Sequence, residues 1–377
     1  MDCDIYYKGK FDVNHVIIML EKWQAGLDQK KVTLIKRIFE NKVPCFVRGC
    51  NENSSFISKH IYLDGFIDDF VSLNTQWQGL PVVRGEELPS DAIVINAALH
   101  RRPHQALERL RKLPNCAHIL HYCDFTRTLP KHCPPLPFVD EARSVFFKYI
   151  NDFVEITSRF ADLKSHRVLY DILLYRLTGD PNFTKSYTVR NKEQYFDVPL
   201  NFSEAPVFVD GGSYDGETTE LFCNYYPNYN SCYLFEPNER SMDLARKRLQ
   251  DYSNIYFFTY ALGDKHELLY FNSEAEAASK IDDKGKTKVE VVPLDDIIDN
   301  HVDYIKLDLE GYEVKALVGA KETIRSYSPL ISVSVYHNIK DFLDVPKTIL
   351  NYKNNYRLLL RHYTEGLDET VMYFIRS

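Results

Sequence analysis

Hydrophobic and polar residues alternate in two patterns along this chain, one typical of helices and the other of short buried strands. Residues 13–23, VNHVIIMLEKW, and 30–40, KKVTLIKRIFE, carry apolar side chains at intervals of three and four, which predicts two helices. From residue 41, short apolar runs such as SDAIVINAAL alternate with helical ones such as PHQALERLRKL. We therefore expect a smaller Rossmann-like α/β domain with leading helices over residues 1–140.

A helical pattern returns between residues 141 and 200 and predicts a helical bridge. Its second run, RVLYDILLYRLTG, closes at Gly179, a residue type suited to ending a helix. Beyond it, apolar runs ending in acids or glycines alternate with helical runs. This alternation of strands and helices predicts a second α/β domain over residues 201–377.

The first strand predicted in this second domain, PVFVD, leads into a turn rich in glycines and acids. The helical run ETTELFCNYY follows, so Gly211, Gly212 and Gly216 occupy a strand-to-helix turn, where α/β sheets bind ligands. Glycine lets the backbone pass close to a ligand. Asp210 and Asp215 stand where a phosphate-binding loop would carry Lys and Ser or Thr, so we expect a ligand with positive charge.

Later strands of the same domain also end in acids. Glu236 closes SCYLFE, where an acid typically accepts hydrogen bonds from a ribose diol. NIYFFTYALGD supplies a third strand whose exit, at Ala261 and Leu262, can flank an adenine. VDYIKLDLEGYEV supplies a fourth strand, ending at Asp308 and Glu310. Together these acids indicate a nucleoside ligand with cationic character.

Five motifs of this region carry a family resemblance: VFVDGGSYDGETT, FEPN, ALGD, VVPLDDI and YIKLDLEGYE, in this order. Residues 195–377 resemble the FkbM-type family of S-adenosylmethionine-dependent methyltransferases. The resemblance implies a class I methyltransferase fold, a seven-stranded, mostly parallel sheet whose last strand, TVMYFIR, is antiparallel. The family usually has Asn where this chain has Tyr214 or Asp215.

The resemblance also implies S-adenosyl-L-methionine as the cofactor. The residues assigned to its binding, from the motifs and the strand ends, are Asp210, Gly211, Gly212, Ser213, Asp215, Gly216, Thr218, Glu236, Pro237, Ala261, Leu262 and Asp308.

Methyl transfer to a hydroxyl group needs a general base, or a cation that lowers the hydroxyl pKa. Candidate catalytic residues stand at the ends of the predicted strands: Asp308, Glu310, His337 and His362. If His337 is the base, its neutral imidazole is the active form, and activity rises with pH through about 6.5. A divalent metal held by Asp308, Glu310 and His337 is possible but is not predicted.

The composition of the chain limits the classes of binding partner and the cellular locations to be expected. The net charge of -7 and the lack of a basic stripe argue against nucleic acid. No apolar run approaches the roughly 20 residues that a membrane span needs, and scattered cysteines fit reduced thiols, so we expect a cytoplasmic protein. In the first domain, Arg101 and Arg102 begin a helix and suggest recognition of a substrate, such as a phosphate-bearing sugar carrier.

The sequence thus predicts an enzyme, an O-methyltransferase that modifies a hydroxyl of a carbohydrate or similar polar metabolite, as a possible homodimer. The acceptor class comes from the resemblance. Two alternatives stay open: methylation of an amine, a carboxylate or a polyketide hydroxyl, and a non-enzymatic nucleoside sensor.

Overall fold

A computed structural model describes residues 9–70, 75–198, 200–202, 204–271 and 287–376. The chain forms two compact units, each assembled from separate stretches of sequence. Unit 1 comprises residues 1–154, 166–191 and 362–368, and unit 2 comprises residues 155–165, 192–361 and 369–377. The three consecutive domains expected from the sequence stay a prediction. No helix in the described part of the chain has the length and apolar character needed to cross a membrane.

Unit 1 opens with two helices, as the apolar spacing predicts. Asp12 and Asp28 cap them by accepting hydrogen bonds from the backbone amides of Asn14 and Lys30. Strands and helices then alternate. The helices are α1 (Val13–Ala25), α2 (Gln29–Phe39), α3 (Glu52–Ile57), α4 (Pro103–Arg111), α5 (Tyr122–Thr128) and α6 (Pro137–Lys148). The helices α7 (Ile150–Thr157) and α8 (Leu163–Thr178) have residues in both units.

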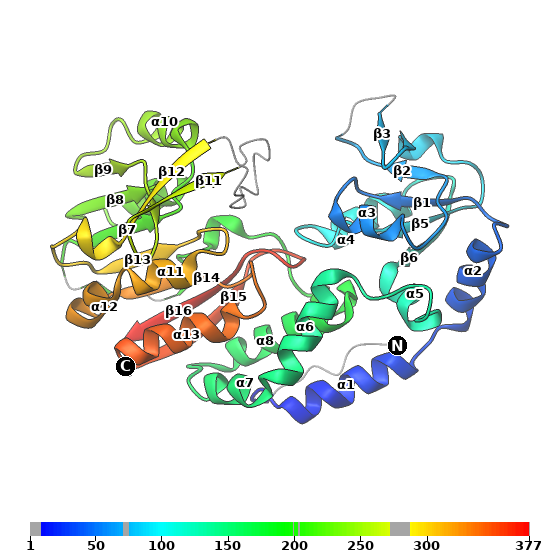
Figure 1. The fold of residues 1–377 in the computed structure, drawn as a ribbon, viewed down its shortest axis with the longest axis horizontal. Helices are drawn as coiled ribbons and strands as arrows, with labels where there is room; N and C mark the ends of the chain where they lie inside the picture. The colour runs from blue at the N-terminus through cyan, green and yellow to red at the C-terminus, as the bar shows by residue number, and fades with distance from the viewer. Residues whose placement is uncertain (1–8, 71–74, 199, 203, 272–286, 377) are drawn as a thin grey trace. The chain divides into compact units, whose positions relative to one another are not determined.

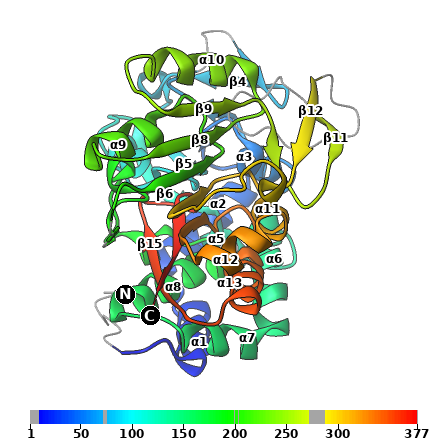
Figure 2. The same cartoon turned by 90° about the vertical axis from the view of Figure 1, so that its left-hand side faces the viewer.

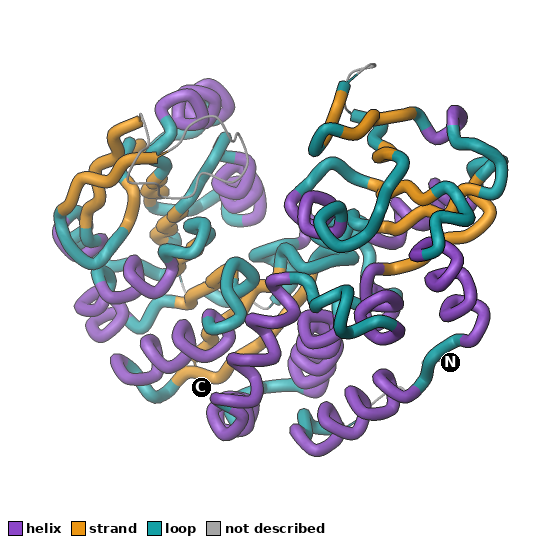
Figure 3. The backbone as a smooth tube through the Cα atoms, turned by 45° about the vertical axis from the view of Figure 1, so that its right-hand side comes forward, coloured by secondary structure: helices purple, strands orange, loops and turns teal. Residues whose placement is uncertain are grey.

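The sheet of unit 1 has the strand order β3-β4-β2-β1-β5-β6. The strands are β1 (Cys45–Arg48), β2 (Gly65–Ile67), β3 (Gln76–Trp77), β4 (Leu80–Val83), β5 (Ala92–Asn96) and β6 (Cys116–His121). Their pairings are parallel except for β3 with β4. Figure 3 shows helices, in purple, beside these strands, in orange. Side chains such as Val47, Phe66 and Ile95 form the buried core.

Unit 2 contains the predicted seven-stranded sheet, in the order β15-β16-β14-β13-β7-β8-β9 (Figure 1). These strands are β7 (Val207–Gly211), β8 (Ser231–Phe235), β9 (Ile255–Phe258), β13 (Tyr304–Leu307), β14 (Leu330–Ser334), β15 (Tyr356–His362) and β16 (Thr370–Arg376). The last strand, β16, runs antiparallel to β14. The predicted class I methyltransferase architecture, including the final antiparallel strand, is confirmed.

Helices cover both faces of this sheet. They are α9 (Glu217–Tyr225), α10 (Glu239–Arg248), α11 (Glu313–Val318), α12 (Lys321–Tyr327) and α13 (Asp341–Tyr352). Figure 2 shows α9 on one side of the sheet and α11, α12 and α13 on the other. Under α9, the rings of Phe208 and Phe222 stack with centroids 4.4 Å apart. This apolar packing fixes where the helix after the glycine turn begins.

A small second sheet was not predicted from the sequence. It has the order β10-β12-β11 and consists of β10 (Ala261–Leu262), β11 (Glu267–Phe271) and β12 (Thr287–Val292). The apolar run NIYFFTYAL therefore divides: its first part forms β9 in the large sheet, and its last two residues form β10. The described residues also form four 3-10 helices: η1 (Gly85–Glu87), η2 (Pro181–Thr184), η3 (Asn191–Glu193) and η4 (Leu294–Asp296).

Candidate active site

The turn after β7 lies directly against the chain that leaves β13. Gly212 has a φ of +73°, and a Cβ atom there would lie 1.9 Å from the carbonyl oxygen of Asp308. The amide of Asp308 donates to the carbonyl oxygen of Gly211 at 3.1 Å. Only glycine fits this approach, because both the φ angle and the space exclude a side chain. The glycine turn and the backbone of Asp308 are thus in direct contact.

Asp210 has a different environment from the one expected from the sequence. It is fully buried, and its Oδ1 lies 3.0 Å from the Nζ of Lys306, the residue opposite it on β13. Thr219 donates a hydrogen bond to its Oδ2 at 2.7 Å. Lys306 therefore balances the charge of this carboxylate within the protein, where a positively charged ligand was expected. Lys306 also donates to the carbonyl oxygens of Gly211 and Gly212, so the pair braces the turn.

Asp215 is likewise paired within the protein. Its Oδ2 lies 2.6 Å from Nη2 of Arg248 on α10, and Arg248 also contacts Glu220 at 3.0 Å. The second carboxylate proposed to attract a cation is therefore already neutralised as well. Its role in the structure is to connect the start of α9 with the end of α10.

Glu236, at the end of β8, is positioned by two backbone amides. Its Oε2 accepts from the amide of Tyr214 at 3.1 Å, and its Oε1 accepts from the amide of Asn238 at 2.8 Å. Burial raises the pKa of Glu236, while these hydrogen bonds oppose the rise. Each oxygen keeps a further lone pair, so the carboxylate can still accept two ribose hydroxyl groups.

An unsatisfied hydroxyl group lies in the same turn. Ser213 is 3% exposed, and its Oγ has no hydrogen-bond partner among the described residues. A buried polar atom without a partner is costly, and a ligand that supplies one removes that cost. The residues of this turn therefore fit a polar ligand such as the cofactor.

The other predicted cofactor residues differ in accessibility. Thr218, Pro237 and Ala261 are half-buried, whereas Leu262 is fully buried. The side chain of Leu262 faces the backbone of Gly211, since a Cβ added there would lie 3.0 Å from its Cδ1. Leu262 therefore packs against the backbone of the glycine turn.

Asp308 is held by two tyrosines. Tyr195 donates to its Oδ2 at 2.9 Å, and Tyr336 donates to its Oδ1 at 3.3 Å. Burial raises the pKa of Tyr195 well above its usual range, and the charge of Asp308 adds to this rise. Tyr195 therefore remains a hydrogen-bond donor at physiological pH.

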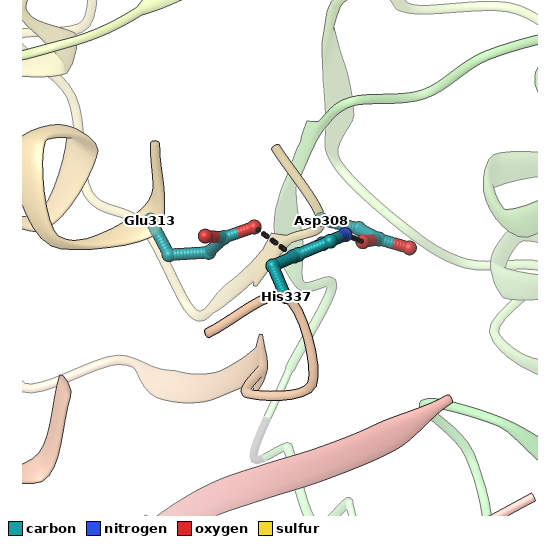
Figure 4. A group of neighbouring side chains, drawn as sticks. All are labelled: Asp308, Glu313 and His337. Atoms are coloured by element: carbon teal, nitrogen blue, oxygen red, sulfur yellow. Dashed lines mark ion pairs between the residues drawn. The ribbon is translucent and has the colours of Figure 1, made fainter. Parts of the chain in front are cut away.

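His337 follows β14 and lies between two carboxylates, as Figure 4 shows. Its Nδ1 is 3.0 Å from Oε1 of the buried Glu313, and its Nε2 is 3.7 Å from Oδ1 of Asp308. Glu310, on an exposed turn with a φ of +52°, brings Oε2 within 3.4 Å of the same Nε2. The structure thus brings Asp308, Glu310 and His337 together, as predicted.

The charge of His337 differs from the expectation. Burial by itself lowers its pKa, but Glu310, Glu313 and Asp308 outweigh burial and raise the pKa to about 11. At neutral pH the ring is therefore a cation, and the neutral imidazole required of a general base is not the favoured form. One atom each of Asp308, Glu313 and His337 lies within 4.8 Å of the others, a spacing that could accommodate a metal ion. Here the protonated ring supplies the positive charge between these carboxylates.

His362 ends β15 and belongs to unit 1. Burial, followed by the charge of Arg176, lowers its pKa to about 3. Its ring makes an edge contact with Tyr187, with centroids 5.1 Å apart. In the sheet, β16 lies between β15, which ends at His362, and β14, which precedes His337.

Several residues of the site were missed from the sequence, among them Lys306, Glu313 and Tyr195. Lys306 could have been found, because a charged residue inside the apolar run YIKL needs a buried partner. Glu313 lies within the quoted motif but was assigned no role. Tyr195 precedes the first strand of the sheet in an irregular segment, where no periodicity points to it.

Comparison with known proteins decides the family of this region. Residues 210–358 match the family model described as the methyltransferase FkbM domain. Unit 2 contains an FkbM methyltransferase domain. The resemblance seen in the motifs is thereby confirmed, and with it the expected enzyme class, an S-adenosylmethionine-dependent methyltransferase. A search of curated proteins gives no significant match.

Solved structures extend the likeness of fold beyond the FkbM domain. A methyltransferase FkbM from Methylobacillus flagellatus KT, 20% identical, covers 96% of this chain and 98% of its own, with a TM-score of 0.72. An rRNA methylase from Streptococcus thermophilus, 13% identical, covers 46% of this chain and 87% of its own, with a TM-score of 0.31. Aeropyrum pernix fibrillarin with bound S-adenosyl-L-methionine, 11% identical, covers 49% and 71%, with a TM-score of 0.33. The first of these shares the fold of nearly the whole chain.

Proposed function

We propose that unit 2 transfers a methyl group from S-adenosylmethionine to a hydroxyl of a carbohydrate or similar polar metabolite. The glycine turn, Ser213 and Glu236 would hold the cofactor, which supplies an electrophilic methyl group when bound. The acceptor would bind at the adjacent cluster formed by Asp308, Glu310 and His337. The substrate class rests on the family resemblance.

The observation that carries this proposal is the contact between Gly212 and Asp308. A Cβ atom at Gly212 would overlap the carbonyl oxygen of Asp308, so the cofactor turn and the acid meet without an intervening side chain. Methyl transfer needs donor and acceptor held in line at short range, and such alignment supplies much of the rate enhancement. A ligand in the turn would lie next to the groups that handle the acceptor.

The charge of the cluster favours a particular acceptor. Asp308, Glu310 and Glu313 surround His337, so carboxylates outnumber the single imidazolium cation. A phosphate or carboxylate acceptor would be repelled by this arrangement, whereas a neutral polyol can donate hydrogen bonds to it. Among the alternatives open from the sequence, an amine remains compatible with the charge and an acidic acceptor is disfavoured.

Asp308 is the best-placed proton acceptor. Tyr195 and Tyr336 orient its carboxylate, and the His337 cation lies beside it. In the proposed reaction the acceptor hydroxyl gives its proton to Asp308 as its oxygen attacks the methyl group. His337 acts as a fixed positive charge that stabilises the surrounding carboxylates, and it does not act as the general base.

The proposed cellular setting rests on the thiols. The eight cysteines are scattered along the chain without a paired framework, which supports a reducing, cytoplasmic environment. A homodimer stays a prediction, and sedimentation of the purified chain is the measurement that checks it.

The full-length chain should be titrated with S-adenosylhomocysteine and then incubated with S-adenosylmethionine and a panel of neutral sugars, amino sugars and sugar phosphates. We expect formation of S-adenosylhomocysteine to depend on a neutral or amino sugar. Cofactor binding without turnover on any hydroxyl, amine or carboxylate acceptor would instead favour the sensor alternative. Loss of turnover with chelator, restored by Mg²⁺ or Mn²⁺, would assign the Asp308 cluster to a metal ion.

A further inference from the structure

We propose that unit 1 carries a second nucleotide-binding site, at the carboxyl ends of β1 and β2, in which Asp68 receives the ribose hydroxyls. The site lies outside the FkbM domain, and its ligand would be a nucleoside 5′-diphosphate or a conjugate of one. The inference takes the proposed role of Glu236 as its template, but its test does not depend on methyl transfer.

The evidence begins with a hydrogen-bond pattern that occurs in both units. In unit 2, the amide of Gly212 donates to the carbonyl oxygen of Phe235 at 2.8 Å, and the amides of Tyr214 and Asn238 donate to the two oxygens of Glu236. This pattern holds an acid at the end of one strand against the turn that follows its neighbour.

Unit 1 repeats each of these contacts. The amide of Gly49 donates to the carbonyl oxygen of Ile67 at 2.9 Å. The amide of Cys50, in the turn after β1, donates to Oδ2 of Asp68, and the amide of Phe70 donates to Oδ1, both at 2.9 Å. Gly49 has a φ of +99°, as Gly212 has a φ of +73°. Asp68 is thus oriented by backbone amides as Glu236 is, and the Cys50 thiol also hydrogen-bonds to it.

The strand order puts this acid at the place where α/β sheets bind ligands. After β1, the chain forms β2 on one side and later β5 on the other side, and all three strands are parallel. Ligands bind in the crevice outside the carboxyl ends of strands where the order reverses. The turn has a single glycine, which argues against a dinucleotide as the ligand. Recognition of a ribose needs only the acid.

A buried amide group near the turn also lacks a partner. Asn53 is 5% exposed, and its Nδ2 donates to no acceptor among the residues that the structure describes. It stands two residues after Asn51, whose Nδ2 donates to the carbonyl oxygen of Ala97 at the end of β5. A ligand oxygen would satisfy a donor that the protein leaves unsatisfied.

The surrounding charges favour an anionic nucleotide over S-adenosylmethionine. Arg48 binds both oxygens of Asp69, at 3.0 and 2.6 Å. Arg84 donates to the carbonyl oxygen of Asp69 at 2.7 Å, and Arg109 approaches its Oδ2 at 3.4 Å. Three guanidinium groups thus contact Asp69, the residue that follows Asp68. Phe70, two residues after Asp68, is 87% exposed and offers a face on which a base can stack.

The test uses the full-length chain, first saturated with S-adenosylhomocysteine so that the site in unit 2 is occupied. Calorimetric titration with ADP, GDP, CDP and UDP is compared with titration with their 2′,3′-dideoxy forms. We expect at least one ribonucleotide to bind at least tenfold more tightly than its dideoxy form. No binding, or equal binding of the two forms, overturns the proposal without any variant being made.

Two variants then assign the site. Asp68→Asn should weaken binding of that ribonucleotide at least tenfold and leave the affinity for S-adenosylhomocysteine unchanged. Glu236→Gln, the matched control, should do the reverse. An Asp68→Asn protein that keeps full ribonucleotide affinity refutes the assignment. If S-adenosylhomocysteine fails to bind while the ribonucleotide does, the proposed function of unit 2 is wrong and this proposal stands.

Discussion

At the scale of single residues, the charge of His337 separates the possible mechanisms. Its folded pKa of about 11 lies above the ordinary value near 6.5, so the folded protein binds the proton more strongly than the unfolded chain. The resulting stabilisation is complete below pH 6.5 and is lost as pH rises towards 11. We expect His337→Gln to cost about 1.5–3 kcal/mol of unfolding free energy at pH 6, as for hydrogen bonds to charged groups, and less at pH 9.

Urea unfolding of the two proteins at both pH values measures this difference. Turnover should show no rise through pH 6.5, because the ring does not lose its proton there. A rise at that pH that disappears in His337→Gln would restore the histidine as the base.

Asp308 and Tyr195 make a second prediction at this scale. If Asp308 accepts the proton, Asp308→Asn should lower kcat by roughly 10² to 10⁴, beyond any effect on cofactor affinity. Tyr195→Phe removes one donor to Asp308 and should lower kcat by about tenfold, the rate equivalent of one hydrogen bond. Tyr229→Phe, which removes a hydroxyl that hydrogen-bonds to the carbonyl oxygen of Ser253 and to the Cys223 thiol, serves as the control. Equal rates for all three variants would remove this network from the reaction.

The buried pair of Asp210 and Lys306 carries a stability prediction. Lys306→Met leaves the carboxylate of Asp210 buried without its cation, which should cost about 3–5 kcal/mol of unfolding free energy. The double variant Asp210→Asn with Lys306→Met should recover part of this loss, because no unpaired charge remains. Urea unfolding monitored by circular dichroism compares them. A double variant no more stable than Lys306→Met would show that the lost stability comes from the hydrogen bonds of Lys306 to Gly211 and Gly212, and not from the unpaired charge of Asp210.

At the scale of elements, the turn between β7 and α9 depends on glycine for two separable reasons. Gly212→Ala should cost roughly 1–2 kcal/mol for the left-handed conformation, plus the displacement of Asp308 that the new Cβ forces. Gly79 has a φ of +78° but open space around its Cβ position, so Gly79→Ala isolates the conformational cost. We expect only Gly212→Ala to weaken S-adenosylhomocysteine binding, measured by calorimetry, and to lose more stability than the control. Equal losses would mean that the contact with Asp308 relaxes freely.

The same scale explains how much the sequence could predict. Apolar rhythm and glycine placement located the strands, and the carboxyl ends of parallel strands meet at one edge, so Asp308 and His337 could be expected together. The ion pairs of the site could not be predicted. The pairing of Asp210 with Lys306, for example, depends on the register between β7 and β13. The bond from Tyr195 to Asp308 joins residues 113 positions apart, one of them in a segment without periodicity.

At the scale of the whole molecule, the division of the chain into units bears on any truncation. Residues 155–165 belong to unit 2 although they precede its main segment by a stretch of unit 1. Within unit 2, the amide of Ala161 donates to the carbonyl oxygen of Leu358, and the amide of Leu360 donates to Oγ of Ser165. Asp162 pairs with the buried Arg361 at 2.6 Å. A cut near residue 190, which a linear view of the domains suggests, removes all of these contacts.

We therefore expect a fragment of residues 190–377 to be less stable than one of residues 150–377. Loss of Asp162 leaves the guanidinium of Arg361 with the more distant Asp197, at 3.6 Å, which costs about 1–3 kcal/mol before the lost backbone bonds are counted. Urea unfolding of both fragments, beside Asp162→Ala in the full chain, measures the two contributions separately. The full-chain variant should reproduce only the ion-pair part of the loss. Fragments of equal stability would show that residues 155–165 add nothing to unit 2, and a simple linear boundary would then suffice.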